Sequence, residues 1–275
     1  MKVIYRKGKK VIIYIIFFVI ALSCIFPFYV MIISATHSTQ ELRTSIALTF
    51  GTQLVNNYNR LTLYFDVWKG MINSFIISAI YSVLVVLSST YCGYVFSKSK
   101  SKLTTKAYIF VLVLLFIPTN LAIIGFYRLI DTIGLLDSYA PLIIPNIVEA
   151  SMLIFSKQYC DITIKNSIVD AALVDGASTL RIFISIIIPD LYPMMVCLGT
   201  LSFIDKWNEF LIPSVIIFSQ NKRTMPIIIA SLRLFVEVDY GAKYTAIMLA
   251  TIPILIIFFV SARRITGVYN EDPNL

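Results

Sequence analysis

Long apolar stretches alternate with short polar segments along most of this chain. Six of these stretches approach or exceed the length of about 20 mainly apolar residues that a helix needs to cross a bilayer. They lie at about residues 11–34, 71–96, 107–128, 139–156, 191–217 and 244–262. The pattern therefore predicts six membrane-spanning helices, and it leaves two longer polar segments, at 35–70 and 157–190.

The composition points to the same class of protein. Of the 275 residues, 58% are hydrophobic and 14% are charged, and the mean hydropathy is +0.84. A chain this apolar cannot cover itself with a polar surface in water. We therefore predict an all-α integral membrane protein with a single transmembrane domain, residues 1–275, and no soluble domain.

Basic residues in the short loops predict the orientation in the membrane. They precede the first span, follow the second and close the sixth: Lys2, Arg6, Lys7, Lys9 and Lys10; Lys98, Lys100, Lys102 and Lys106; Arg263 and Arg264. Because such loops stay in the cytoplasm, both termini and the segment 157–190 are expected there. The net charge of +8 is thus mostly a topology signal, and no nucleic-acid partner is expected.

Residue types that carry catalysis or bind metals are scattered. Cys24, Cys92, Cys160 and Cys197 lack a pair spacing, and His37 stands alone. The chain has no Gly-x-x-x-x-Gly-Lys phosphate loop. We expect no catalytic residue, metal or cofactor in this chain, and the sequence disfavours a membrane enzyme.

The polar segment between the fourth and fifth spans predicts two short helices joined by a turn. The first runs from Lys165 to Leu173, with an apolar face of Ile168, Ala171, Ala172 and Leu173. Gly176 permits the turn. Ser178 or Thr179 caps the second helix, which runs through Phe183 to Ile188 and is expected to stop at Pro189 and Pro193. The amphipathic pattern alone fits equally well a linker lying in the lipid interface.

The residues of this segment resemble the docking loop of an ABC importer's membrane subunit. That family's motif reads Glu-Ala-Ala, three residues, Gly, then an apolar helix ending in Leu-Pro. Here the run is Asp170-Ala171-Ala172-Leu173-Val174-Asp175-Gly176-Ala177, closed by Ile188-Pro189. The resemblance covers nearly the whole chain. It departs at Asp170, which is one methylene shorter than Glu, and at the polar tail after Gly267.

The resemblance implies the fold and the partners. The fold would be that of a type I importer permease, with core helices at about 71–265, an extra helix at about 11–34 and a cytoplasmic coupling-helix loop at about 157–190. The implied partners in a bacterial cell membrane are a second homologous permease, an extracellular solute-binding protein and two ATPase subunits that bind ATP and Mg. The residues implied to dock the ATPase are Asp170, Ala171, Ala172, Asp175, Gly176, Ala177 and Pro189.

A charged cluster interrupts the fifth apolar stretch, at Asp205-Lys206-Trp207-Asn208-Glu209. Asp205 and Glu209 are four residues apart and would share one helical face. Ionisable residues at membrane depth normally face a cavity or each other. One interpretation is a self-neutralised cluster in the headgroup region. The other, favoured by a resemblance of Trp-Asn-Glu-Phe-Leu to the carbohydrate-importing branch, is a translocation path or gate of Asp205, Trp207, Asn208 and Glu209, with Trp207 stacking on a sugar.

Together these features predict a permease subunit of an ATP-driven importer. It would move a sugar or oligosaccharide, delivered by the solute-binding protein, through alternating access. A non-sugar solute such as a polyamine or a phosphonate is the alternative within this class. A proton-coupled secondary transporter using Asp205 and Glu209 is the alternative outside it, although no inverted repeat is evident.

Overall fold

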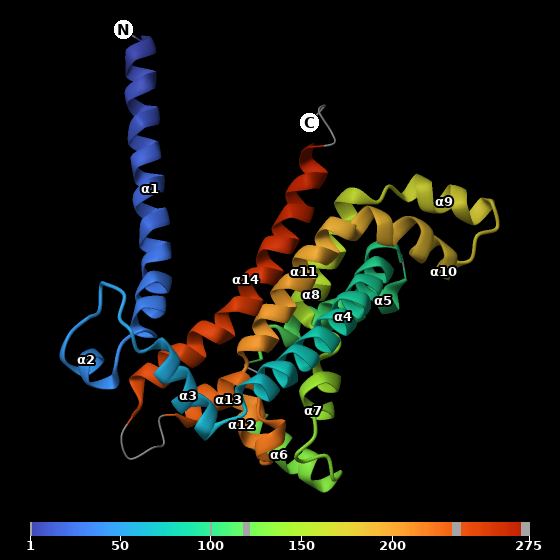
Figure 1. Ribbon diagram of the computed structural model, residues 1–275. Helices are drawn as coiled ribbons and strands as arrows, with labels where there is room; N and C mark the ends of the chain where they lie inside the picture. The colour runs from blue at the N-terminus through green and yellow to red at the C-terminus, as the bar shows by residue number, and fades with distance from the viewer. Residues whose placement is uncertain (1, 100, 118–121, 233–237, 271–275) are drawn as a thin grey trace. The chain divides into compact units, whose positions relative to one another are not determined.

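The computed structural model describes residues 2–99, 101–117, 122–232 and 238–270, and every regular element in these ranges is a helix (Figure 1). The chain divides into two compact units, residues 1–67 with 228–252 and residues 68–227 with 253–275. The prediction of an all-α membrane protein is confirmed.

The six predicted spans differ in how regular they are. Four helices of the described chain are long and apolar enough to cross a membrane, at Ile12–Ser34, Val67–Lys98, Thr179–Ile216 and Tyr240–Arg264. The fourth predicted span is a pair of segments, Ala140–Asn146 and Ala150–Thr163, bent by 41°. Pro145 lies in the 3-10 turn before this bend, η2 (Ile144–Asn146), where its missing N–H costs no helical hydrogen bond.

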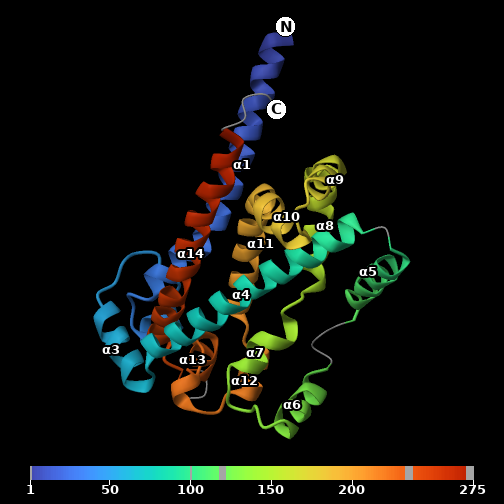
Figure 2. The same cartoon turned by 90° about the vertical axis from the view of Figure 1, so that its right-hand side faces the viewer.

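The third predicted span, 107–128, is not one continuous helix. It is divided between α5 (Lys102–Leu114) and α6 (Ile123–Thr132), which Figure 2 shows as separate helices. Residues 118–121, including Pro118, lie outside the described ranges. The apolar stretch predicted one spanning helix here. Hydrophobicity alone does not show that the stretch is divided into two helices.

The first unit holds α1 (Lys2–Ser34), α2 (Thr39–Thr44), α3 (Leu54–Tyr64), the end of α13 (Met225–Ser231) and the first part of α14 (Tyr240–Asn270). The Asn57 amide of α3 donates to the carbonyls of Ala35 and His37, both at 2.8 Å. Arg60 of the same helix pairs with Asp239, just before α14, at 2.7 Å. Burial would raise the pKa of Asp239, but hydrogen bonds from the Ala242 N–H, Arg60 and Thr39 lower it. Polar contacts thus connect α3 both to the end of α1 and to the start of α14.

The second unit contains the remaining helices. They are α4 (Val67–Lys98), α5, α6, α7 (Ala140–Ile143), η2, α8 (Ala150–Thr163), α9 (Asn166–Val174), α10 (Thr179–Ile182), the π-helical turn η3 (Phe183–Ile187), α11 (Ile188–Asn208), α12 (Leu211–Ile216), η4 (Gln220–Lys222) and the rest of α13 and α14. One apolar cluster joins α4, α8, α9, α10 and α11 through residues such as Val86, Cys160, Val169, Ile182 and Leu191. This cluster fixes the polar segment 157–190, the docking segment, to the long helices of the second unit.

Asp137 links the loop before α7 to the loop after α12. Its carboxylate accepts hydrogen bonds from the backbone N–H groups of Phe218 and Ser219, both at 3.0 Å, and from the Ser219 hydroxyl at 2.5 Å. Lys222 pairs with the same carboxylate at 3.3 Å. The Ser219 hydroxyl, followed by these N–H groups and Lys222, holds the pKa of Asp137 well below its ordinary value of 3.8.

This linkage predicts a pH-dependent stability that Asp137→Asn removes. Because the folded-state pKa is lowered, the carboxylate stabilises the fold fully above the ordinary pKa, and the contribution is lost as the pH falls through the folded value. Asparagine tolerates the φ of 55° found at this residue. In thermal unfolding of the detergent-solubilised protein, we expect the midpoint to fall more steeply below pH 3.8 for the wild type than for Asp137→Asn. Parallel decline of the two would contradict the assignment.

Candidate functional site

The docking segment is a helix, a turn and a helix, as its sequence predicts. Figure 1 shows α9 and α10 side by side at one end of the second unit. Gly176 makes the turn with a φ of +78°, a left-handed conformation that glycine adopts without strain. Ser178 caps α10 by accepting a hydrogen bond from the Arg181 N–H at 3.3 Å. The geometry of the segment therefore follows from two residues, Gly176 and Ser178.

One face of the docking segment packs inward and the other is exposed. Val169, Ala172, Ala177 and Ile182 pack in the apolar cluster with α4 and α8. Of the apolar face predicted for α9, only Ala172 lies on this inner side, while Ile168, Ala171 and Leu173 are exposed. The reason is that α9 directs Val169 inward, and Ala172, one turn later, shares that face.

The exposed side forms what we call the docking surface, made of Ile168, Leu173, Val174 and Leu180 with the acids Asp170 and Asp175. Val174 is 88% exposed and Leu180 is 63% exposed. Asp170, Ala171 and Gly176 are also exposed. An apolar surface with acids beside it, on two helices that already have a packed inner face, is typical of an interface with another protein.

Pro189 and Pro193 do not end the second docking helix, contrary to the prediction. The helix continues from Thr179 through α10, η3 and α11 to Asn208, with Pro189 in the first turn of α11 and Pro193 inside it. The wide turn η3 precedes them, and the Ile188 N–H bonds to the carbonyl of Phe183, five residues back. A proline ring normally clashes with the carbonyl four residues earlier. The wider turn relieves that clash for Pro189, so α10 passes directly into the membrane helix.

A cavity of about 900 Å³ lies in the second unit beside the charged cluster of α11. Leu114, Leu115 and Ile117 form part of its apolar wall. Its polar wall contains Tyr81 of α4, Asn146, Glu149 and Ser151 near the bend before α8, and Asp205, Lys206, Asn208 and Glu209 at the end of α11. The cavity thus brings together polar groups from helices far apart in the sequence.

Lys206 is paired on two sides. Its side chain is only 5% exposed, and its Nζ lies 2.7 Å from the Glu209 carboxylate and 4.2 Å from the centre of the Tyr81 ring. The Tyr81 hydroxyl donates to Glu149 at 3.3 Å, and the Ser151 hydroxyl donates to the other carboxylate oxygen at 2.6 Å. These contacts satisfy the ammonium but leave the carboxylates of Glu149 and Asp205 without a cationic partner among the described residues.

The structure separates the four residues predicted for the path. Asp205, Asn208 and Glu209 line the cavity, whereas Trp207 is 2% exposed and stacks on Phe203 at 5.7 Å between ring centroids. Asp205 and Glu209 do not share a helical face, because α11 ends at Asn208 and Glu209 has an extended backbone. Local spacing predicts faces only as far as the helix extends.

Tyr81 and Glu149 were not singled out by the sequence analysis. Glu149 did offer a signal, since it is the only charged residue in the apolar stretch 139–156. Tyr81 offered none, because α4 also contains Tyr91 and Tyr94 and nothing in the sequence distinguishes Tyr81 from them. Only the packing of α4 beside α8 and α11 places it in the cavity.

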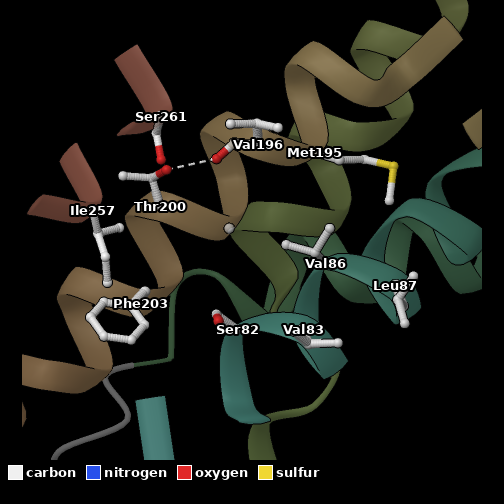
Figure 3. Close-up of a pocket in the computed structure, with 11 residues that line it drawn as sticks. Ser82, Val83, Val86, Leu87, Met195, Val196, Thr200, Phe203, Ile257 and Ser261 are labelled. Carbon is white, nitrogen blue, oxygen red and sulfur yellow. Dashed lines mark hydrogen bonds between the residues drawn. The ribbon is translucent and has the colours of Figure 1, made fainter. Parts of the chain in front are cut away.

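A second cavity, of about 370 Å³, lies between α4, α11 and α14 and is mostly apolar (Figure 3). The Thr200 hydroxyl donates to the Val196 carbonyl at 2.8 Å, as Figure 3 shows, and Ser82 donates to the Ala79 carbonyl at 3.0 Å. Both hydroxyls are therefore satisfied within their own helices. This space is an apolar gap between helices and offers little to a polar solute.

Among the described residues, no three His, Cys, Asp or Glu side chains are grouped closely enough to hold a metal ion. The four cysteines are free. The site consists instead of an exposed docking surface and a polar cavity in the membrane helices.

Comparison with known proteins supports the resemblance. Residues 138–268 match the family described as binding-protein-dependent transport system inner membrane component. The lactose transport system permease protein of Rhizobium radiobacter is 28% identical over 264 residues, 96% of each chain. The arabinooligosaccharides transport system permease protein of Halalkalibacterium halodurans is 27% identical over 248 residues, 89% of this chain and 88% of that one.

A solved structure shares the fold. It belongs to a bacterial ABC transporter involved in the import of the acidic polysaccharide alginate, with a TM-score of 0.78 at 17% identity, over 94% of this chain and 96% of that chain. The matched family region contains both the docking segment and the end of α11. Over residues 138–268 this chain is therefore similar to the binding-protein-dependent transport system inner membrane components, and its docking segment and fold resemble those of the permease subunits of ABC importers.

Proposed function

We propose that the docking surface on α9 and α10 receives an ATPase subunit on the cytoplasmic side of the membrane. The observation that carries this proposal is the exposure of Ile168, Leu173, Val174 and Leu180 on helices whose opposite face is fixed in the core. Asp170 and Asp175 add a polar contact for basic residues of the partner. Both termini are then cytoplasmic, as the basic loops predict.

We further propose that the polar cavity forms this chain's share of a passage for a sugar or oligosaccharide. A second homologous permease would supply the opposite wall, two ATPases would supply the energy, and an extracellular binding protein would deliver the solute. Asp205, Asn208, Glu149 and Ser151 offer acceptors and donors that suit sugar hydroxyls. The sugars in the names of the two relatives support the same solute class.

The charge of the cavity narrows the choice of solute. It contains the carboxylates of Glu149, Asp205 and Glu209 and the single ammonium of Lys206, which is a balance of 1 − 3 = −2. This balance disfavours a phosphonate or another anion, because like charges repel in a site of low dielectric constant. A polyamine is compatible with the charge and is the second candidate.

Uptake by cells that contain the native importer tests the solute and the energy source together. We expect deletion of this chain to reduce the uptake of radiolabelled lactose or arabino-oligosaccharide to background, and the intact chain to restore it. Uptake should persist when an uncoupler removes the proton gradient while ATP is kept high. Loss of uptake under the uncoupler would favour proton coupling, and loss of putrescine uptake alone on deletion would identify a polyamine importer.

A further inference from the structure

Lys98 lies at the corner where the docking segment begins. It is the last residue of α4, and its ammonium donates to the Ile164 carbonyl at 2.5 Å and to the Asn166 side-chain oxygen at 3.0 Å. Ile164 is the cap residue that directly follows α8, and Asn166 is the first residue of α9. The Lys98 side chain therefore connects α4 to the junction of α8 and α9, although the sequence marked it only as a topology signal.

The packing around this contact leaves α4 little freedom to slide past the segment. A Cβ on Gly93 would lie 2.6 Å from the Ser156 Cβ and 2.8 Å from the Lys157 backbone nitrogen, so α4 and α8 meet there almost backbone to backbone. On the other side, the rings of Tyr91 and Tyr94 contact Phe183 at 5.1 and 5.9 Å. The end of α4 thus contacts the chain both before α9 and after α10.

The same helix reaches the cavity. Tyr81 precedes Lys98 by 98 − 81 = 17 residues, or roughly 25 Å at the helical rise of 1.5 Å per residue. Its ring lies under the Lys206 ammonium and its hydroxyl bonds to Glu149. One helix therefore joins the docking corner at its end to the charged groups of the cavity.

We propose that Lys98 is a positioning residue that couples movement of the docking helix α9 to α4 and so to the cavity. This inference rests on the proposed function, since it assumes that the ATPase moves α9. Without the ammonium, the corner loses the hydrogen bonds that connect it to α4, while the docking surface itself is unchanged. The ATPase would still bind, but its closure would move the cavity less.

A thiol reporter in the cavity measures this coupling without knowledge of the solute. In a background whose four native cysteines are replaced by alanine, Asn208→Cys is introduced into the complex co-purified with its ATPase and placed in nanodiscs. The rate of modification by a positively charged methanethiosulfonate is measured before and after trapping with ATP and vanadate. For Lys98→Met we expect the ATP-dependent change in rate to shrink about tenfold, the size expected from loss of a hydrogen bond with a charged donor.

Two control variants test whether the effect of Lys98→Met comes from the lost hydrogen bonds and not from the lost positive charge. Lys98→Arg keeps a cationic donor and should retain the response, and Lys102→Met removes one positive charge at an exposed position and should also retain it. A Lys98→Met response equal to that of Lys102→Met would overturn the proposal. If Lys98→Met does not assemble with the ATPase, Asn166→Ala takes its place, because it removes one acceptor of the Lys98 ammonium. A reduced ATP-dependent change in its modification rate would support the coupling, and a full change would overturn it. Absence of the ATPase from the wild-type complex would instead refute the docking assignment itself.

Discussion

Gly176→Ala is expected to weaken retention of the ATPase about tenfold, as measured by co-purification at graded partner concentrations. The turn needs a φ of +78°, and holding a residue with a side chain in this left-handed region costs about 1–2 kcal/mol. Nothing lies within 4 Å of the added Cβ, so the cost is conformational and not a clash. Relaxation of the turn would misalign α9 and α10 and remove the docking surface from its partner.

Gly134→Ala provides a matched control for this prediction. Gly134 has a φ of +69° and equally open surroundings, but it lies in the loop after α6, away from the docking segment. Both variants should lose similar stability in thermal unfolding, and only Gly176→Ala should lose the ATPase. Gly176→Asn should recover part of the binding, since asparagine tolerates the left-handed region. Equal ATPase retention by the two alanine variants would contradict the role of the turn.

Glu209→Ala is expected to destabilise the protein by about 3 kcal/mol, because it leaves the buried Lys206 ammonium without its charged partner. Lys206 is 5% exposed, while Glu209 is 21% exposed and lines the cavity. Lys206→Met should therefore cost less than Glu209→Ala, since a glutamate facing a polar cavity keeps access to water. Thermal unfolding in detergent and the yield of folded protein measure both effects.

A double-mutant cycle distinguishes this pair from a general packing effect. In the variant that combines Lys206→Met with Glu209→Ala, no unpaired charge remains, so part of the stability lost in Glu209→Ala should return. The introduced methionine side chain would keep an apolar contact with the Tyr81 ring. Additive losses in the double variant would show that the ion pair contributes little, and would favour a solvated ammonium at this position.

Much of the backbone conformation of the docking segment could be predicted from its local sequence. A left-handed turn favours glycine, and a serine before a helix caps it through a hydrogen bond to a backbone N–H only three residues away. Gly176 and Ser178 therefore predicted the turn and the second cap correctly. The apolar face was less predictable. Ile168 and Leu173 are strongly hydrophobic, as Val169 is, and only the position of the core beside α4 and α8 determines which of them is buried.

The set of residues that line the cavity could not be predicted from the sequence, because it depends on the packing of distant helices. Asp205, Asn208 and Glu209 could be selected because charge within an apolar stretch is costly, but Trp207 in the same run is buried against Phe203. Tyr81 and Glu149 complete the site from other helices. The continuation of α11 through Pro189 and Pro193 was also missed, because a π turn that relieves a proline clash leaves no clear mark in hydrophobic periodicity.

The sequence was sufficient to predict a helical membrane chain and a glycine turn in the segment that resembles a docking loop. Apolar length, basic loops and the conformational freedom of glycine are properties of consecutive residues, so they can be recognised without the fold. Helix packing determines which apolar side chains of α9 remain exposed and which charges pair at the end of α11, and it brings Lys98 of α4 to the docking corner. These features join residues that are far apart in the chain or compete for one buried surface, and only the packing of whole helices settles such choices.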